Sequence, residues 1–306
     1  MNLYYNGTDI YKDVSVNYCV HEMYAEKQAD ALVIRFNDVN GIWSKWNPSD
    51  GDTLRLKDGA GDTGKMFVHS LKPENGLYTL RALSIPKSAG TKHSKSWEGV
   101  RFLQVANEIA ERHGLKFKNY GCPDQLYPYL VQNNLEDFVF FSRLCTREGC
   151  QMLVYDGNLM AYKESYIESQ SAAATLEVNE NGFFAYQDNR AEGFGSCEIA
   201  SGNCFGKFTD PNATTSTVLR PNVPLLVTSN AEAARFAKGL LRDANKYGQT
   251  GKITKSLLKE YAAASIVNIK TQKASTWDGK AFVYKVIHDY VKNKTIMYVR
   301  KPLEGY

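Results

Sequence analysis

Apolar and polar residues alternate through much of the segment 1–83, which is the period of a half-buried β-strand. In "ALVIRF", for example, Leu32, Ile34 and Phe36 share one face, opposite Arg35. Glycine, aspartate and proline separate such segments, and the Asn-Gly pair in "YYNGTD" favours a two-residue hairpin turn. We therefore expect several short antiparallel strands that form a small barrel or sandwich.

The period changes after residue 100. In "RFLQVANEIAERHG" the apolar positions follow helical spacing from Phe102 to Ala110, and Gly114 stands where a helix ends. A second helix is predicted in "NNLEDFVFFSRLCTREG", with Asn134 as its N-cap and Gly149 after its end. Strand-like segments surround both helices, so this region is predicted to be a small α+β unit.

Strand-like patterns return after residue 168, interrupted by one more helix at about 230–247. Its packing face is predicted to be narrow, because it is lined by small residues and one leucine: Ala231, Ala234, Ala237, Leu241 and Ala244.

The predicted fold class is α+β, mainly β. We expect a first barrel-like β-module at 1–90, a small α+β domain at 91–168, and a second barrel-like β-module at 169–306 that contains the long helix.

Charge is distributed unevenly along the chain. Residues 226–306 carry 15 lysines and arginines against 6 aspartates and glutamates, whereas the remainder carries 22 against 27. This asymmetry favours contact with a charged partner or with copies of the same chain, and a solvated face without a partner is the alternative.

Sequence motifs for catalysis are missing. The five histidines are isolated, and no metalloprotease, hydrolase or phosphate-loop motif is present. The six cysteines form no C-x-x-C pair, so we expect free and mostly buried thiols. We expect no enzyme activity, no catalytic or metal-ligating residues and no cofactor.

Targeting signals are also not evident. No apolar run approaches the roughly 20 residues that span a bilayer, and the first residues lack a basic start followed by an apolar stretch. We expect no membrane anchor and synthesis in the cytoplasm.

Four segments in order carry a family resemblance. "LRALSIPKSAGTKHSKSWEGVRFLQVANEIAERHGLKF" resembles the late control protein D family, the baseplate hub proteins of contractile phage tails. In that family a strand leads into a basic run, then an aromatic residue, here Trp97, and then a helix ending in His-Gly. "LEDFVFFSRLCTREGCQMLVYDGNLMAYKE", "NAEAARFAKGLLRDANKYGQTGKIT" and "WDGKAFVYKVIHDY" are similar to later segments of the family. The likeness covers nearly the whole chain, except that residues 185–225 match nothing.

The resemblance implies a structural role. Its members, like the hub part of type VI secretion spikes, form homotrimers in which two barrel-like modules per chain make a six-fold-like ring around a central channel. The ring joins the hexameric tail tube to the trimeric central spike. The implied partners are the tail tube or tube-initiator protein, the spike, the tape-measure protein and baseplate wedge proteins, with non-specific passage of DNA. The implied location is the baseplate of a virion or tail-like particle that assembles in the bacterial cytoplasm.

The basic stretch at 84–100, "SIPKSAGTKHSKSWEGV", supplies the candidate contact residues. If it crosses between modules as an extended strap, Lys87, Lys92, Lys95 and Trp97 would face a neighbouring subunit or the channel. A solvated linker is the alternative.

A different class of function stays open beside the hub. In a stand-alone carbohydrate-binding or hydrolytic β-protein, Trp43 and Trp46 of "GIWSKWNP" would be a sugar platform. A role in packing a turn is the other interpretation of these tryptophans.

Overall fold

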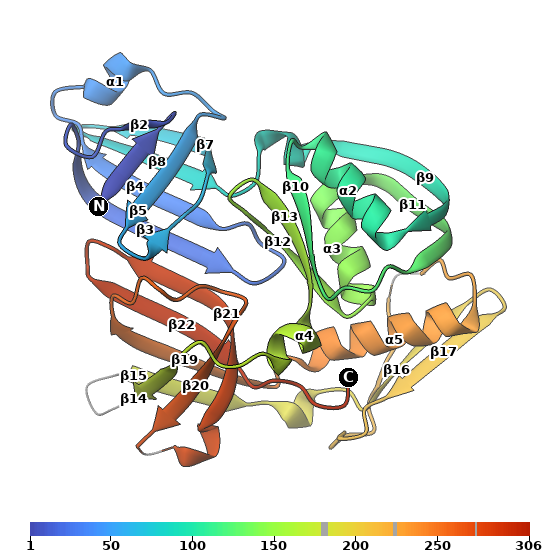
Figure 1. The fold of residues 1–306 in the computed structure, drawn as a ribbon. Helices are drawn as coiled ribbons and strands as arrows, with labels where there is room; N and C mark the ends of the chain where they lie inside the picture. Colours follow the sequence, from blue (N-terminus) through green and yellow to red (C-terminus); the bar gives the residue numbers. More distant parts are fainter. Residues whose placement is uncertain (179–182, 223–224, 273) are drawn as a thin grey trace.

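The computed structural model describes residues 1–178, 183–222, 225–272 and 274–306. Within these residues strands predominate over helices, so the fold is α+β and mainly β, as predicted. Two β-rich units lie on one side of the molecule and a unit with helices lies on the other (Figure 1). No helix of the described segments has the length and apolar character needed to cross a membrane.

The first β-unit, residues 1–83, confirms the predicted strands. Leu32, Ile34 and Phe36 have no exposed surface, as the alternating pattern requires. The Asn-Gly turn is also confirmed, because Asn6 and Gly7 both have positive φ between two paired strands. The elements are β1 (Asn2–Tyr5), β2 (Thr8–Asp9), β3 (Ser15–Tyr24), β4 (Ala31–Asn37), α1 (Ile42–Trp46), β5 (Thr53–Asp58), β6 (Gly61–Asp62), β7 (Met66–Glu74) and β8 (Leu77–Leu83).

The helical unit follows. A two-stranded ribbon and a three-stranded sheet, in the order β10-β13-β12, flank two helices that share one apolar core. The elements are η1 (Lys87–Gly90), β9 (Lys92–Arg101), α2 (Phe102–Arg112), β10 (Lys116–Tyr120), β11 (Leu126–Glu136), α3 (Asp137–Arg147), β12 (Cys150–Tyr155), β13 (Asn158–Lys163) and α4 (Glu164–Ser169).

The predicted N-cap of the second helix is wrong. Asn134 lies in β11 at a bulge, with φ 46°, and α3 begins at Asp137 after Glu136. Asparagine suits a helix cap and a left-handed bulge equally well, so the pattern alone did not separate the two.

The long helix α5 (Asn230–Asn245) differs from expectation in its packing face. It packs against α3 and against β16 (Ser196–Ser201) and β17 (Cys204–Thr209), and its side chains join the core of the helical unit. Its buried stripe contains Ala233, Phe236, Ala237 and Leu241, whereas Ala231 and Ala244 are exposed. The sequence placed this helix inside the second β-module, and that placement stays a prediction. Its apolar stripe packs mainly on β16 and β17, which also belong to residues 169–306, and on α3 of the helical unit. The boundary at residue 168 stays a prediction.

The second β-unit takes its strands from both sides of α5. β14 (Thr175–Val178) and β15 (Phe183–Asp188) precede the helix, and β19 (Gln249–Ser256), β20 (Ser265–Thr271), β21 (Gly279–Asp289) and β22 (Lys294–Arg300) follow it. Short elements lie between them: η2 (Arg190–Glu192), β18 (Val218–Leu219) beside β16, and η3 (Ser275–Trp277). All six cysteines are free and five are buried, which confirms that prediction.

Candidate functional site at the junction of the units

One strand pair joins the two β-units into a single sheet. Residues 20–24 of β3 pair antiparallel with residues 285–289 of β21, so the described strands form one 14-stranded sheet across both units. Figure 1 shows the first unit and the C-terminal strands lying side by side at this seam. One edge of each β-unit is therefore covered within the chain, because the backbone N–H and C=O groups of β3 and β21 form hydrogen bonds with each other.

The outer face of the seam carries an ion pair between the two units. Lys285 Nζ lies 3.1 Å from Glu22 Oε2 and donates to Tyr24 Oη at 3.0 Å. The same ammonium lies 4.6 Å from the centroid of the Tyr24 ring and 5.8 Å from that of Tyr298. These half-buried contacts add a cation–π interaction to the backbone pairing.

The inner face of the seam lines a cavity of about 390 Å³ between both β-units and the three-stranded sheet. His21 and His288, which are directly opposite each other in the strand pair, lie in its wall and are buried. His288 is held by Thr295 Oγ1 at 2.9 Å from Nδ1 and by the carbonyl of Tyr261 at 3.0 Å from Nε2. Burial lowers the pKa of His21 to about 3, with His288 adding to this effect, and burial raises the pKa of Asp30, also in the wall, to about 7.

A buried ionic cluster connects the second β-unit to both helices beside it. Arg300 of β22 has no exposed surface, and its guanidinium lies 2.9 Å from Glu164 and 2.5 Å from Glu168 of α4. Arg242 of α5 contacts the same two carboxylates at 3.2 and 2.5 Å. Although burial alone would raise it, Lys246, Arg300 and Arg242 hold the pKa of Glu164 below its ordinary value.

The cluster also reaches the first β-unit. Lys246, which directly follows α5, is buried and contacts Glu26 in the β3–β4 connection, together with Asp243 at 2.8 Å and Glu164 at 3.4 Å. Tyr247 donates to the same Glu26 carboxylate. Because its charged residues come from all three units, the cluster couples the units to one another.

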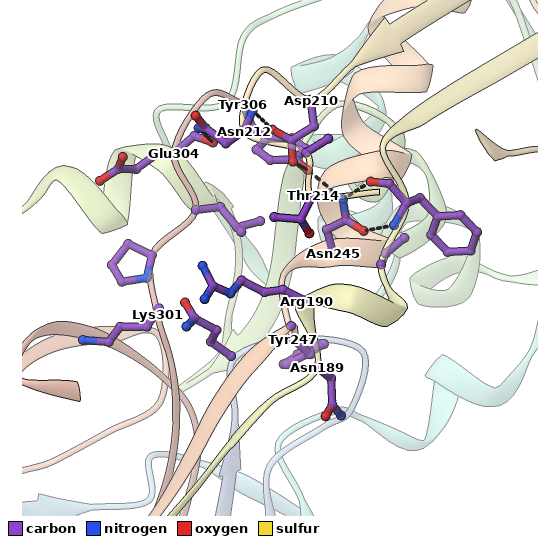
Figure 2. Close-up of a pocket in the computed structure, with 18 of the residues that line it drawn as sticks. Asn189, Arg190, Asp210, Asn212, Thr214, Asn245, Tyr247, Lys301, Glu304 and Tyr306 are labelled. Atoms are coloured by element: carbon purple, nitrogen blue, oxygen red, sulfur yellow. Dashed lines mark hydrogen bonds between the residues drawn. The ribbon is translucent and has the colours of Figure 1, made fainter. Parts of the chain in front are cut away.

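A cavity of about 930 Å³ lies where the second β-unit meets α5 and the segment at 301–306. Asn245 donates to Tyr306 Oη at 2.8 Å and to the Phe194 carbonyl at 2.7 Å, and Tyr306 donates to Asp210 at 2.7 Å. Figure 2 shows Tyr306 and Asp210 close together at one side of this cavity and Arg190 nearer the other. The dashed bonds of Figure 2 connect Asn245 of α5 to Phe194 and to Tyr306, and connect Tyr306 to Asp210. This wall of the cavity therefore holds α5, two loops and the 301–306 segment together.

The basic stretch at 84–100 is ordered within the chain. It forms η1 and then strand β9, which pairs with β11 over most of its length, so it is neither a strap nor a solvated linker. The linker interpretation was wrong because a polar stretch can still be a strand. In a two-stranded ribbon, apolar residues are needed only on the face that packs against a helix.

The four predicted contact residues have different surroundings. Trp97 is buried, its ring stacks on Phe140 with centroids 5.5 Å apart, and its Nε1 donates to Glu108 at 2.9 Å. Lys95 donates to the other oxygen of Glu108 at 2.6 Å. Lys87 is exposed and paired with Asp50 of the first β-unit, and Lys92 is exposed opposite Glu136 in the β9–β11 pair. Contact with a neighbouring subunit stays a prediction for all four: Lys87, Lys92, Lys95 and Trp97.

The two tryptophans of the predicted sugar platform are in edge-to-face contact, with ring centroids 5.2 Å apart, but they differ in exposure. Trp43 is only 1% exposed and packs against Phe36, Tyr5 and Tyr78, whereas Trp46 is 41% exposed. This placement favours the packing role for Trp43.

Sequence reasoning missed the groups at the junction. Glu26, Glu164, Arg242 and Arg300 lie far apart in the chain and follow no motif spacing. The one available signal was a charged residue, Arg300, at the end of the strongly apolar segment "TIMYVR". Among the described residues, no group of three or more histidines, cysteines and carboxylates is arranged to hold a metal ion.

Comparison with known proteins supports the resemblance through structure. No protein-family profile matches the sequence, and no curated protein sequence matches it. The 43 kDa tail protein of prophage MuSo2 from Shewanella oneidensis is 11% identical and superposes with a TM-score of 0.72, over 97% of this chain and 96% of that chain. A tail protein from Neisseria meningitidis MC58 is also 11% identical, with a TM-score of 0.75 over 98% of this chain and 95% of that one.

A third solved structure links the fold to secretion. The E. coli c3393 protein is a type VI secretion system component with structural similarity to the T4 bacteriophage tail proteins gp27 and gp5. It is 11% identical, with a TM-score of 0.62 over 100% of this chain and 78% of that chain. The chain therefore shares its fold with these phage tail proteins and with this type VI secretion system component, as the resemblance implied.

Proposed function

We propose that this chain is the baseplate hub of a contractile phage tail or tail-like particle. Three copies close into a ring to which each contributes two β-units, and the ring joins the hexameric tail tube to the trimeric central spike around a channel. The role is structural and not enzymatic. The ring also meets the tape-measure and baseplate wedge proteins, and the particle assembles in the bacterial cytoplasm.

The observation that carries this proposal is the seam between β3 and β21. It presents two β-units side by side in one sheet within a chain whose fold matches phage tail proteins along almost its whole length. Three such chains supply six β-units, which is the number that a hexameric tube requires of its adaptor.

The edge strands at the two ends of the 14-stranded sheet offer surfaces through which copies of the chain could pair and close a ring. Among the described strands, β2 has β1 as its only neighbour at one end of the sheet, and β15 has β19 as its only neighbour at the other. Unpaired margins at opposite ends of one sheet favour head-to-tail contact between copies, which closes when the rotation between neighbours is one third of a turn.

Native mass spectrometry of the purified chain tests the proposal. We expect a species of three times 34.4 kDa, either alone or after addition of the tail-tube and spike proteins of the same particle. Negative-stain electron microscopy of that species should show a ring with a central opening. A monomer under all these conditions, or a closed ring of another number of copies, would contradict the hub.

A further inference from the structure

Strand β12 is an edge strand of the three-stranded sheet in the helical unit. Its only described strand neighbour is β13, on one side. The backbone N–H and C=O groups of alternate residues therefore point away from the sheet on the other side.

A groove of about 790 Å³ runs along this open margin. Met152, Leu153 and Val154 all line it. Successive side chains of a strand point to opposite faces of the sheet. A groove that is lined by three consecutive residues therefore lies along the open edge of the strand and not over one face of the sheet. The volume lies in the range of about 300–1,000 Å³ that ligand pockets have.

The walls of the groove combine apolar side chains with two arginines of α3. Phe138 and Val139 of α3 and Leu240 of α5 line it, and Val139 is 37% exposed. Arg143 and Arg147, one helical turn apart on α3, line it too, and no ion pair of the described residues includes either of them. Burial, together with the nearby Arg143 guanidinium, lowers the pKa of Arg147, although Glu232 and Glu148 act in the opposite direction.

Two lysines around the groove are already paired. Lys27 contacts Asp243 at 2.8 Å, and Lys87 contacts Asp50. Glu136 lies opposite Lys92 in the β9–β11 pair. Four cations, including Arg143 and Arg147, and two carboxylates, Glu136 and Asp243, line the groove, so its net charge favours an acidic occupant.

We propose that this groove binds an extended peptide segment of another protein, which adds to β12 as a further strand and carries a carboxylate to Arg143 and Arg147. The apolar walls accept side chains at alternate positions of that strand, on the face turned toward α3. An extended backbone is the occupant that satisfies the open margin of β12, because a lipid chain offers it no hydrogen bonds. This assignment is independent of whether the chain forms a ring.

A displayed library of random ten-residue peptides, panned on the wild-type protein, tests the proposal. We expect the enriched peptides to share alternating apolar positions and an acidic residue. Their binding, followed by fluorescence anisotropy, should weaken at least tenfold in Arg143→Glu and in Val139→Asp. Hydrogen exchange should slow in residues 150–155 when an enriched peptide is added. Panning on Arg143→Glu should instead enrich basic peptides.

Two exposed residues outside the groove supply matched controls. Arg101→Glu and Val291→Asp make the same changes at sites that are exposed, and they should leave peptide binding within twofold of wild type. The proposal is overturned if no peptide is enriched, if the groove and control variants bind alike, or if protection falls on another strand margin. It is also overturned if Arg143→Glu abolishes self-association of the chain, since the occupant is then a second copy, or abolishes binding to vesicles of anionic phospholipid without affecting peptides.

Discussion

At the scale of single residues, the buried groups beside the seam determine how the first β-unit responds to pH. Asp30 is 9% exposed, and its carboxylate accepts the Tyr24 backbone N–H at 2.8 Å. One hydrogen bond does not replace the hydration that burial removes, so the pKa of Asp30 rises from 3.8 to about 7. The folded protein therefore holds a proton on Asp30 between these values, whereas the unfolded chain does not.

Replacement of Asp30 by asparagine should stabilise the protein at high pH. With a folded pKa above the unfolded one, Asp30 lowers stability progressively as pH rises from about 4 to about 7. An asparagine oxygen keeps the bond to Tyr24 without a charge. We expect Asp30→Asn to raise the free energy of unfolding at pH 8 by about 1 kcal/mol or more, with a smaller gain at pH 5, measured by urea titration.

The comparison between pH values isolates Asp30. His21 and His288 share the cavity and titrate with the opposite sign, but they are present in both proteins, so their effect cancels in the difference. Asp13→Asn, at an exposed site, should change stability by less than about 0.5 kcal/mol at either pH. A loss of stability in Asp30→Asn at pH 8 would show that the charged form is the favoured one.

At the scale of elements, local pattern was a good guide to where strands and helices occur and a poorer guide to what covers them. The alternation at 31–37 and the helical spacing from Phe102 both appear as β4 and α2. For α5, alanines on several sides of the helix allowed more than one packing face. The side that is buried contains Phe236 and Gly239, because β17 and α3 approach there.

The contact between α3 and α5 requires a glycine. A Cβ added at Gly239 would lie 2.2 Å from the carbonyl oxygen of Arg147, a distance that atoms in real structures do not adopt. We expect Gly239→Ala to lower the free energy of unfolding by about 1–3 kcal/mol, since the two helices must separate. Thermal unfolding followed by circular dichroism measures the loss.

Gly90→Ala is the matched control for this substitution. A Cβ at Gly90 meets no atom within 4 Å, and Gly90 is not among the glycines with positive φ. Its stability should stay at or slightly above wild type, because alanine restricts the unfolded chain. Equal losses in both variants would refute the close helix contact.

At the scale of the whole molecule, charges from distant parts of the chain converge in one buried cluster. Glu26 follows β3, Glu164 begins α4, Lys246 follows α5 and Arg300 ends β22. Neutralising one member leaves its partners buried and unpaired, which costs about 3–5 kcal/mol. The arrangement of the units therefore depends on each of these side chains.

Acid should loosen this arrangement. Glu164 has a folded pKa below its ordinary value of 4.5, so its contribution is complete above pH 4.5 and is lost as pH falls toward the folded pKa. We expect Glu164→Gln to lower the free energy of unfolding by about 3 kcal/mol at pH 7. The difference from wild type should shrink below pH 4.5, as measured by urea titration at several pH values.

The exposed Glu111 on α2 provides the comparison for this test. Glu111→Gln should stay within about 0.5 kcal/mol of wild type at every pH. If Glu164→Gln behaves like Glu111→Gln, the cluster does not hold the units together.

The sequence by itself determined the local elements, the mainly β class and, through the order of four segments, the phage-tail resemblance. These follow from the spacing of apolar residues, which each segment carries within itself. Only the tertiary structure decided that residues 20–24 pair with 285–289, that residues 92–101 form a paired strand, and that α5 packs on β16, β17 and α3. Backbone pairing between distant strands leaves no side-chain signature, and a buried charge such as Arg300 looks like a surface charge until its partners from other segments are brought beside it.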